Sequence, residues 1–304
     1  MIYIIGAGAI GKALAVFLTD AGQQVSLIRG SVDHEPSKME TISVINQNGE
    51  AFRAEVEVAT LSHFKRLDGP VVIATKAFAN EKLAIKLKAL NGSFPVVLLQ
   101  NGLNVENPFS EFNEVYRCVL FSTSQISPNG VVSFKTVTSS PIGVITGTTT
   151  PAKEVVNVLN TPNFEFHYDA DIQQHIWTKT IINCAFNSLC PLLEVDNGIF
   201  FKNTGVFQLA KTIIAEGVQV AKQYAINLDA TAIEKKLIFI SEKAEGQLIS
   251  TYEDLNKKRR TEIEFLNQAI AGLAAKKGQP ELAQNTKLLG EIISLKSSIQ
   301  GSNG

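Results

Sequence analysis

The sequence has few cysteines, and their spacing fits neither a disulfide framework nor a metal site. Cys118, Cys184 and Cys190 are the only ones among 304 residues, and none belongs to a Cys-x-x-Cys or Cys/His pattern. Secreted domains that depend on disulfides carry many regularly spaced cysteines. The cysteine content therefore indicates a reducing compartment, and we expect a cytoplasmic protein without a bound metal.

The chain also lacks an excess of charge and a long apolar run. Its formal net charge is −1, so no overall basic field would draw it to nucleic acid or anionic lipid. No stretch approaches the roughly 18 uninterrupted apolar residues of a membrane span. The apolar start Ile2–Ile5 is interrupted by Gly6 and has no preceding basic segment, unlike a secretory signal. Nucleic acid and membranes are not expected partners.

Apolar residues are plentiful, and in the first half they alternate between strand and helix patterns. The expected strands are Ile2–Ile5, Gln24–Ile28, Val71–Ala74 and Val96–Leu99, and the expected helices are Ala9–Ala21 and Asn80–Leu90. Such alternation predicts a parallel sheet covered on both faces. Short β-rich pieces at residues 115–145 predict a strand meander that extends this sheet.

Helical patterns dominate the second half. The clearest are Ile172–Leu189, Val206–Tyr224, Thr231–Ala244 and Thr261–Lys277. The sequence thus predicts the α/β class with two domains. An N-terminal Rossmann-type dinucleotide-binding domain is expected at residues 1–167, and an all-helical substrate domain at residues 168–304.

A glycine-rich turn follows the first expected strand and opens the first expected helix. Its residues are Gly6, Ala7, Gly8, Ala9, Ile10 and Gly11, a GxGxxG pattern. Gly6 permits a tight turn, Gly8 lets the backbone approach a pyrophosphate, and Gly11 allows close packing of helix and strand. The free N–H groups of the helix start favour phosphate. The alternative is a tight turn without a ligand.

The end of the second expected strand indicates which dinucleotide binds. NAD-binding proteins carry Asp or Glu there for the ribose 2′-hydroxyl, whereas an arginine nearby accommodates the 2′-phosphate of NADP. Here the strand ends in Arg29 with no carboxylate. The sequence therefore favours NADP(H), unless Arg29 is an ordinary surface arginine.

Three polar residues share one face of an otherwise apolar helix. Lys179, Asn183 and Asn187 are spaced i, i+4 and i+8, among residues such as Ile181 and Phe186. Polar groups on a buried helix require partners or a ligand. The alternative is a stripe that faces solvent. Farther along the chain, Glu262 and Glu264 fall in the first turn of the expected helix at residues 261–277, and composition does not decide which of them matters.

Taken together, these motifs resemble the ketopantoate reductase (2-dehydropantoate 2-reductase) family over nearly the whole chain. Besides the glycine turn and Arg29, the matching motifs are Thr75-Lys76-Ala77, Gln100-Asn101-Gly102, the W-x-K-x3-N-x3-N helix from Trp177, Asn197-Gly198, and Ser250 ahead of Thr261-Glu262-Ile263. The chain departs from the family's pattern at Gln247, where many relatives carry Asn, and at Ser188, where Pro is common.

The resemblance implies an activity and a role for each matched residue. Lys179 would be the catalytic general acid and Glu262 its carboxylate partner. Lys76 and Asn101 would contact the cofactor. The substrate site would be lined by Asn101, Lys179, Asn183, Asn187, Asn197 and Ser250. The implied reaction is NADPH-dependent reduction of ketopantoate to pantoate, on the route to pantothenate and coenzyme A.

Two other functions remain open at this point. One is an NADP-dependent reductase of another small branched 2-oxo acid, and the other is a dinucleotide-binding sensor without activity. The presence of both Lys179 and Glu262 argues against the sensor. Because the glycine turn and Lys179 fall in different domains, the sequence predicts an active site between the domains. The small-molecule substrate is the expected partner of a monomer or homodimer.

Overall fold

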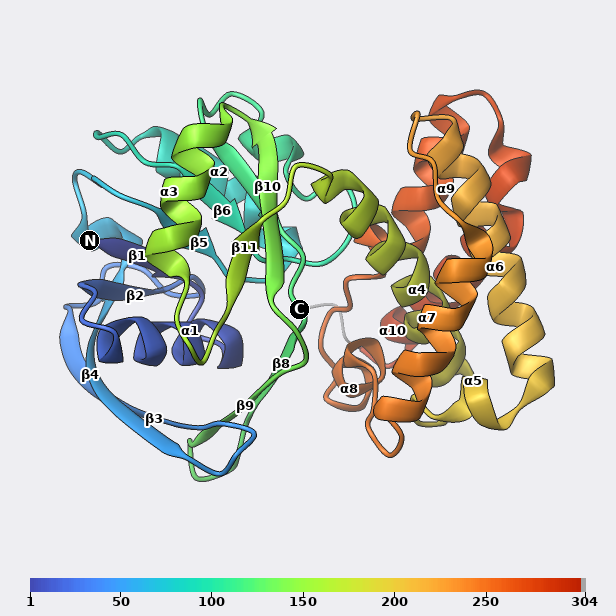
Figure 1. Ribbon diagram of the computed structural model, residues 1–304, viewed down its shortest axis with the longest axis horizontal. Coiled ribbons are helices and arrows are strands. Elements are labelled where there is room, and N and C mark those ends of the chain that lie inside the picture. Colours follow the sequence, from blue (N-terminus) through green and yellow to red (C-terminus); the bar gives the residue numbers. More distant parts are fainter. Residues whose placement is uncertain (302–304) are drawn as a thin grey trace. The chain divides into compact units, whose positions relative to one another are not determined.

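A computed structural model describes residues 1–301, which divide into two compact units (Figure 1). The first unit comprises Met1–Gln100 and Val105–Ile172, and the second comprises Asn101–Asn104 and residues 173–301. Asn101–Asn104 falls within the predicted first domain, whereas its contacts join it to the second unit. No helix within residues 1–301 has the length and apolar character needed to cross a membrane.

Within residues 1–301, eleven strands form one mixed sheet in the order β11-β10-β7-β6-β5-β1-β2-β4-β3-β9-β8. The strands are β1 (Ile2–Ile5), β2 (Val25–Arg29), β3 (Lys38–Ile45), β4 (Ala51–Thr60), β5 (Val71–Ile73), β6 (Val96–Leu98), β7 (Val115–Cys118), β8 (Ser122–Ile126), β9 (Val132–Thr136), β10 (Ser140–Thr146) and β11 (Phe166–Tyr168). The central strands β4-β2-β1-β5-β6-β7 are all parallel. Numbered along the chain, their order is that of the Rossmann fold. The predicted fold class is confirmed.

The two edges of the sheet differ from the sequence prediction. At one edge β3 pairs antiparallel with β4, and the antiparallel pair β8–β9 joins β3 through β9. At the other edge β10 pairs antiparallel with β7 and carries β11. The expectation of a single meander at residues 115–145 was therefore wrong, because its strands separate to opposite edges of the sheet.

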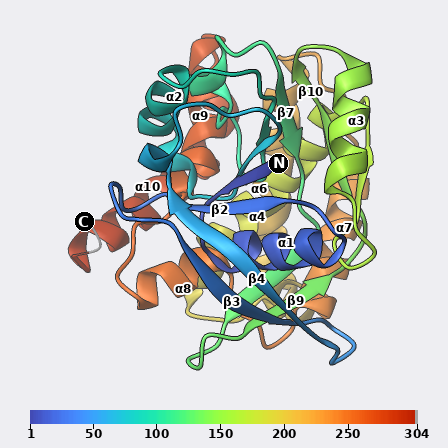
Figure 2. The same cartoon turned by 90° about the vertical axis from the view of Figure 1, so that its left-hand side faces the viewer.

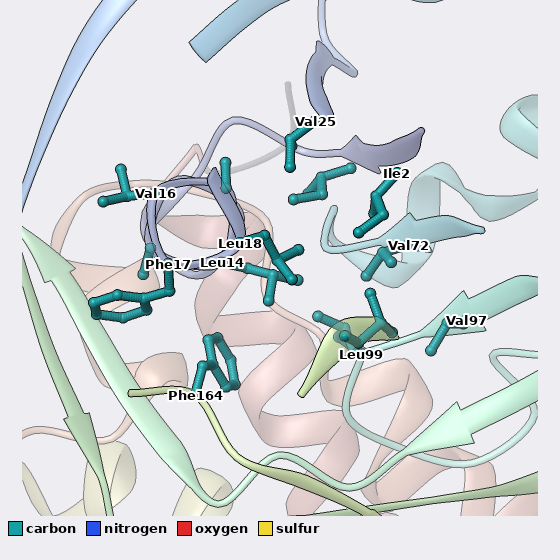
Figure 3. Packing of buried hydrophobic residues seen from close by; sticks show 14 of the residues in the cluster. Ile2, Leu14, Val16, Phe17, Leu18, Val25, Val72, Val97, Leu99 and Phe164 are labelled. Carbon is teal, nitrogen blue, oxygen red and sulfur yellow. The ribbon is translucent and has the colours of Figure 1, made fainter. Parts of the chain in front are cut away.

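The core of the first unit forms where α1 (Ala9–Asp20) lies against the sheet. Figure 2 shows β4, β3 and β9 curving past this helix. Leu14, Phe17 and Leu18 of α1 are buried among residues of the central strands, and Phe164 approaches them from the segment before β11 (Figure 3). The remaining helices of this unit are α2 (Asn80–Lys88) and α3 (Thr149–Leu159).

The second unit is helical, and no strand occurs in residues 173–301. Its helices are α4 (Ile172–Leu193), α5 (Ile199–Lys202), α6 (Thr204–Lys222), α7 (Ala230–Lys243), α8 (Ser250–Asn256), α9 (Asn267–Lys276) and α10 (Gln284–Ile299). Helices α4 and α6 approach closely, because a Cβ at Gly217 would lie 2.7 Å from the Ile181 side chain.

The predicted helix at residues 261–277 was wrong at its start. The chain forms a 3₁₀ turn at Ile263–Phe265, and α9 begins only at Asn267. Leu266, with φ −109° and ψ −102°, interrupts the helical path between them. Glu262 therefore precedes a 3₁₀ turn and does not lie in the first turn of an α-helix.

We expect Phe164 to contribute strongly to the stability of the first unit. Its side chain is fully buried, and its ring centroid lies 4.6 Å from that of Phe134 and 4.8 Å from that of Phe166. Phe164→Ala should lower the free energy of unfolding by about 3–5 kcal/mol, measured by chemical denaturation. Ile85→Ala, at a position on α2 that is 70% exposed, is the control. Equal losses in the two variants would contradict this description of the core.

Candidate functional site

Four chain segments that carry predicted site residues meet at one edge of the sheet. The glycine turn follows β1, Arg29 ends β2, Lys76 follows β5, and Asn101 follows β6. Because these strands are parallel, their carboxyl ends share an edge. The strand order reverses between β1 and β5, and dinucleotides bind Rossmann folds outside that point.

The glycines of the turn differ in what surrounds them. Gly6 has φ +125°, and a Cβ there would lie 2.7 Å from the carbonyl carbon of Ala74. A Cβ at Gly11 would overlap the carbonyl oxygen of Gly6. A Cβ at Gly8 would meet no atom within 4 Å. Close packing within the protein thus requires glycine at positions 6 and 11, whereas the lack of a side chain at Gly8 leaves open space.

The start of α1 suits an anion. Gly8 is its N-cap and has no side chain to accept the first N–H groups, and the first turn has no acidic residue. Such N–H groups at the positive end of a helix dipole favour phosphate. Together with the space at Gly8, this arrangement fits the pyrophosphate of a nicotinamide dinucleotide.

Arg29 has a partner that sequence analysis missed. Its Nη2 lies 2.5 Å from Oε2 of Glu35, in the loop between β2 and β3. The Arg29 Nε is buried and has no hydrogen-bond partner within residues 1–301. No carboxylate follows Arg29 directly in the chain, but the loop between β2 and β3 folds back and brings Glu35 to the same guanidinium. Spacing along the chain does not reveal such a contact.

A buried polar network fixes the loops that carry Lys76 and Asn101. The Gln100 side chain donates to the Thr75 carbonyl at 2.8 Å and exchanges hydrogen bonds of 2.7 Å with the Asn80 amide. From β7, the buried Arg117 donates to the Gln100 carbonyl at 3.2 Å. This network was not predicted from the sequence, although an arginine inside the apolar run of β7 indicates a buried partner.

The segment Asn101–Asn104 lies against the 3₁₀ turn that follows Glu262. The Leu103 N–H donates to the Phe265 carbonyl at 2.9 Å. Gly102 has φ +97°, and a Cβ there would overlap the same carbonyl. Asn101 and Glu262, both half-buried, therefore lie on two segments in direct contact.

The polar face of α4 has the predicted spacing and finds partners far along the chain. Lys179 and Asn183 are half-buried, and Asn187 is buried. Asn187 Oδ1 accepts hydrogen bonds of 3.2 Å from the Ser250 hydroxyl and from the Thr251 N–H. Its Nδ2 donates to the Asn183 carbonyl at 3.0 Å. The structure thus brings Asn187 and Ser250 together, with Asn187 capping the start of α8.

Asn197 contacts the same stretch of chain. Its N–H donates to the Gln247 carbonyl at 2.9 Å, three residues before Ser250. Its side-chain Oδ1 is buried and has no hydrogen-bond partner within residues 1–301. Most buried acceptors have a hydrogen-bond partner, which can be a protein group, a ligand or water. Residues 247–251 are therefore bordered by both Asn187 and Asn197.

The two candidate carboxylates differ in their surroundings. Arg260 Nη2 lies 2.9 and 3.0 Å from the two carboxylate oxygens of Glu264, an i,i+4 surface pair. Glu262 is half-buried, directly before the turn that contacts Asn101–Asn104. The two acids are buried to a similar degree; Glu264 pairs with Arg260, and Glu262 directly precedes the turn that contacts Asn101–Asn104.

The chain is similar to known proteins over nearly its whole length. Residues 2–147 match the family described as ketopantoate reductase PanE/ApbA, and residues 171–295 match its C-terminal counterpart. A 2-dehydropantoate 2-reductase of Pyrococcus abyssi is 29% identical over 310 residues, covering 99% of each chain. One from Lactococcus lactis is 26% identical over 280 residues, covering 89% of this chain and 90% of the relative.

Two solved structures share the fold. D-mandelate dehydrogenase with NADH and anilino(oxo)acetate superposes with a TM-score of 0.83 at 23% identity over 99% of both chains. A dimeric ketopantoate reductase from Staphylococcus aureus superposes with a TM-score of 0.81 at 19% identity over 99% of both chains. At these identities the likeness concerns the fold.

The glycine turn yields a paired prediction. Gly8→Ala should leave the melting temperature unchanged, because its Cβ meets nothing, yet weaken dinucleotide binding at least about tenfold by blocking the pyrophosphate. Gly11→Ala should lower the melting temperature, because its Cβ overlaps the Gly6 carbonyl. Fluorescence titration and thermal unfolding measure the two effects. Normal binding by Gly8→Ala would show that the pyrophosphate lies elsewhere.

Proposed function

The chain belongs to the ketopantoate reductase family, and from this membership we propose that it is an NADPH-dependent 2-dehydropantoate 2-reductase. It would reduce ketopantoate to pantoate, on the route to pantothenate and coenzyme A. The observation that carries the proposal is the pairing of two features in one chain: a glycine turn open at Gly8, and the polar face of α4 joined to Ser250.

The first unit would hold the cofactor. The turn Gly6–Gly11 would bind the pyrophosphate through backbone N–H groups, and Arg29 would bind the 2′-phosphate. Lys76 and Asn101 would contact the cofactor from the loops after β5 and β6. A bound nicotinamide supplies the hydride for the carbonyl carbon of the substrate.

Lys179 would act as general acid. As the carbonyl carbon is reduced, its oxygen gains negative charge and needs a proton. The Lys179 ammonium would stabilise that charge and transfer the proton. Glu262 would keep the ammonium charged, because an opposite charge favours the charged form of a lysine. Glu264 is assigned no catalytic role, since Arg260 already pairs with it.

Uncharged polar groups would hold the substrate. These are Asn101, Asn183, Asn187, Asn197 and Ser250. Because the Ser250 hydroxyl donates its proton to Asn187, the oxygen remains free to accept a hydrogen bond. It therefore suits the substrate's terminal hydroxyl better than its carboxylate. The buried Oδ1 of Asn197 is a second acceptor.

A second candidate is an NADP-dependent reductase of another small branched 2-oxo acid. Gln247, which departs from the family's pattern, accepts the Asn197 N–H and so lies beside a candidate substrate contact. NADPH oxidation with ketopantoate, 2-ketoisovalerate and other 2-oxo acids tests both readings. A kcat/KM highest for ketopantoate supports the first, and one highest for another acid supports the second. Cofactor binding with no turnover on any of them would indicate a sensor.

We expect Lys179→Ala to lower kcat by at least about 10²-fold, the usual contribution of a general acid. Its Kd for NADPH should change little, because the lysine acts at the carbonyl group. Glu262→Ala should lower kcat less. Glu264→Ala, the matched control, should have a mild effect. Near-normal kcat in Lys179→Ala would refute the mechanism, and a larger defect from Glu264 than from Glu262 would show that the wrong carboxylate was assigned.

Ser250→Ala should raise KM for ketopantoate and leave KM for 2-ketoisovalerate unchanged, because only ketopantoate carries the terminal hydroxyl. Losing one hydrogen bond corresponds to about a three- to tenfold change. Asn187→Ala should in addition lower the melting temperature, since it removes buried hydrogen bonds to α8. Equal KM changes for both substrates in Ser250→Ala would contradict the assigned hydroxyl contact.

A further inference from the structure

The guanidinium assigned to the 2′-phosphate is already bound to an anion of the protein. Arg29 Nη2 and Glu35 Oε2 lie 2.5 Å apart, and the two side chains are 24% and 45% exposed. The pair is thus open to solvent on one side, where a ligand can reach it. An incoming phosphate has to displace the Glu35 carboxylate or bind beside it.

Backbone contacts hold the β2–β3 loop so that Glu35 stays near Arg29. The Thr60 hydroxyl, at the end of β4, donates to the Glu35 carbonyl at 3.3 Å. The N–H of the preceding His34 donates to the Ser62 hydroxyl at 2.9 Å. His34 has φ +60°, a left-handed conformation that turns the chain back toward β2. These contacts involve the backbone of the loop and not the Glu35 carboxylate.

Asp33 provides a second attachment of the same loop. Its Oδ1 accepts the Ser62 N–H at 3.1 Å, and its Oδ2 lies 2.6 Å from Lys86 Nζ of α2. The Lys86 ammonium, followed by the Ser62 hydrogen bond, holds the pKa of Asp33 well below its usual value. The loop is therefore tied to β4 and α2 on either side of His34, and Glu35 is presented to Arg29 by a fixed backbone.

We propose that Glu35 determines cofactor selectivity by competing with the 2′-phosphate for Arg29. This inference rests on the proposed function, which assigns Arg29 to that phosphate. The phosphate of NADPH must either displace the Glu35 carboxylate from Arg29 or bind beside it, and in both cases it lies near a like charge. The 2′-hydroxyl of NADH meets neither obstacle, and a carboxylate at this edge can accept its hydrogen bond. Glu35 therefore narrows the preference for NADPH and lets the protein also use NADH.

The test compares Kd values for NADPH and NADH in the intact protein and in single variants. Glu35→Gln keeps the size of the side chain and removes its charge. It should tighten NADPH binding about three- to tenfold, the range expected when a half-exposed ion pair and a like-charge repulsion are removed. Its affinity for NADH should not increase. Damage to the fold would weaken both cofactors, so tighter NADPH binding is a result that a structural defect does not produce.

Glu111→Gln is the matched control. Glu111 pairs with Lys88 at 2.9 Å and precedes β7, so it lies toward the amino ends of the parallel strands, opposite to the edge where β2 ends. The variant has the same change in net charge and should leave both Kd values unchanged. In the Arg29→Ala background, Glu35→Gln should have a smaller effect on NADPH than in the intact protein, because the competition acts through Arg29.

The possible outcomes distinguish a failure of the role of Glu35 from a failure of the cofactor assignment on which it rests. If Arg29→Ala weakens NADPH binding but Glu35→Gln leaves it unchanged, the role of Glu35 is refuted and the assignment of Arg29 stands. If Glu35→Gln tightens NADPH and NADH equally, or Glu111→Gln reproduces its effect, the selectivity role is also refuted. If the intact protein binds neither cofactor, or Arg29→Ala binds NADPH normally, the proposed function itself fails.

Discussion

Three turns of the first unit meet at Thr75, and two of them do so through glycine. A Cβ at Gly6 would lie 2.8 Å from the Thr75 nitrogen, and one at Gly30 would lie 2.8 Å from its Cγ2. The third turn is that of Thr75 itself, after β5. Because real Cβ atoms essentially never approach so closely, any side chain at Gly6 would force these turns apart. Gly8 lies two residues after Gly6, and Arg29 directly precedes Gly30, so both candidate cofactor contacts lie beside this crowded point.

The loops beyond Thr75 depend on buried polar groups. Arg117 is almost fully buried on β7 and pairs with Glu106. A buried charge without a partner is strongly destabilising, so this pair constrains the chain on which Glu106 lies. Arg117 also binds the Gln100 carbonyl, and the Gln100 side chain binds the Thr75 carbonyl. One network therefore sets the backbone on either side of Asn101–Asn104 and of Lys76.

Much of this arrangement could be predicted from the sequence where the signal is local. The β1 strand, α1 and the glycine turn follow from an apolar run and glycine spacing, and the polar face of α4 follows from helical periodicity. The β3–β4 hairpin was not predicted, although Val56 and Val58 alternate with Glu55 and Glu57 and Asn48-Gly49 marks a turn, which are both local signals of a hairpin. The start of α9 was misplaced, because the break at Leu266 accommodates a tertiary contact of Phe265 with Leu103.

Contacts between residues far apart in the chain could not be predicted from the spacing of motifs along the sequence. Asn187 and Ser250 were both candidates, yet only the structure shows which atom donates to which, and that direction decides what Ser250 offers a ligand. Helix α10 was also not among the predicted helices. Leu288, Ile292, Leu295 and Ile299 recur at helical spacing within it, and all four side chains are exposed.

If Lys179 is the general acid, one physical requirement explains why the polar side chains around it are neutral. A lysine can donate a proton to a developing oxyanion only while the lysine is protonated. Every additional cation nearby favours loss of the lysine's proton. Asn183 and Asn187 carry dipoles without charge on the same helix face, and Ser250 adds a neutral hydroxyl. In that case neutral amides would orient an anionic substrate by directed hydrogen bonds while leaving the lysine charged. Arginines in place of these neutral residues would bind the carboxylate more strongly. Their positive charge would disfavour the protonated form of Lys179, which the reaction needs.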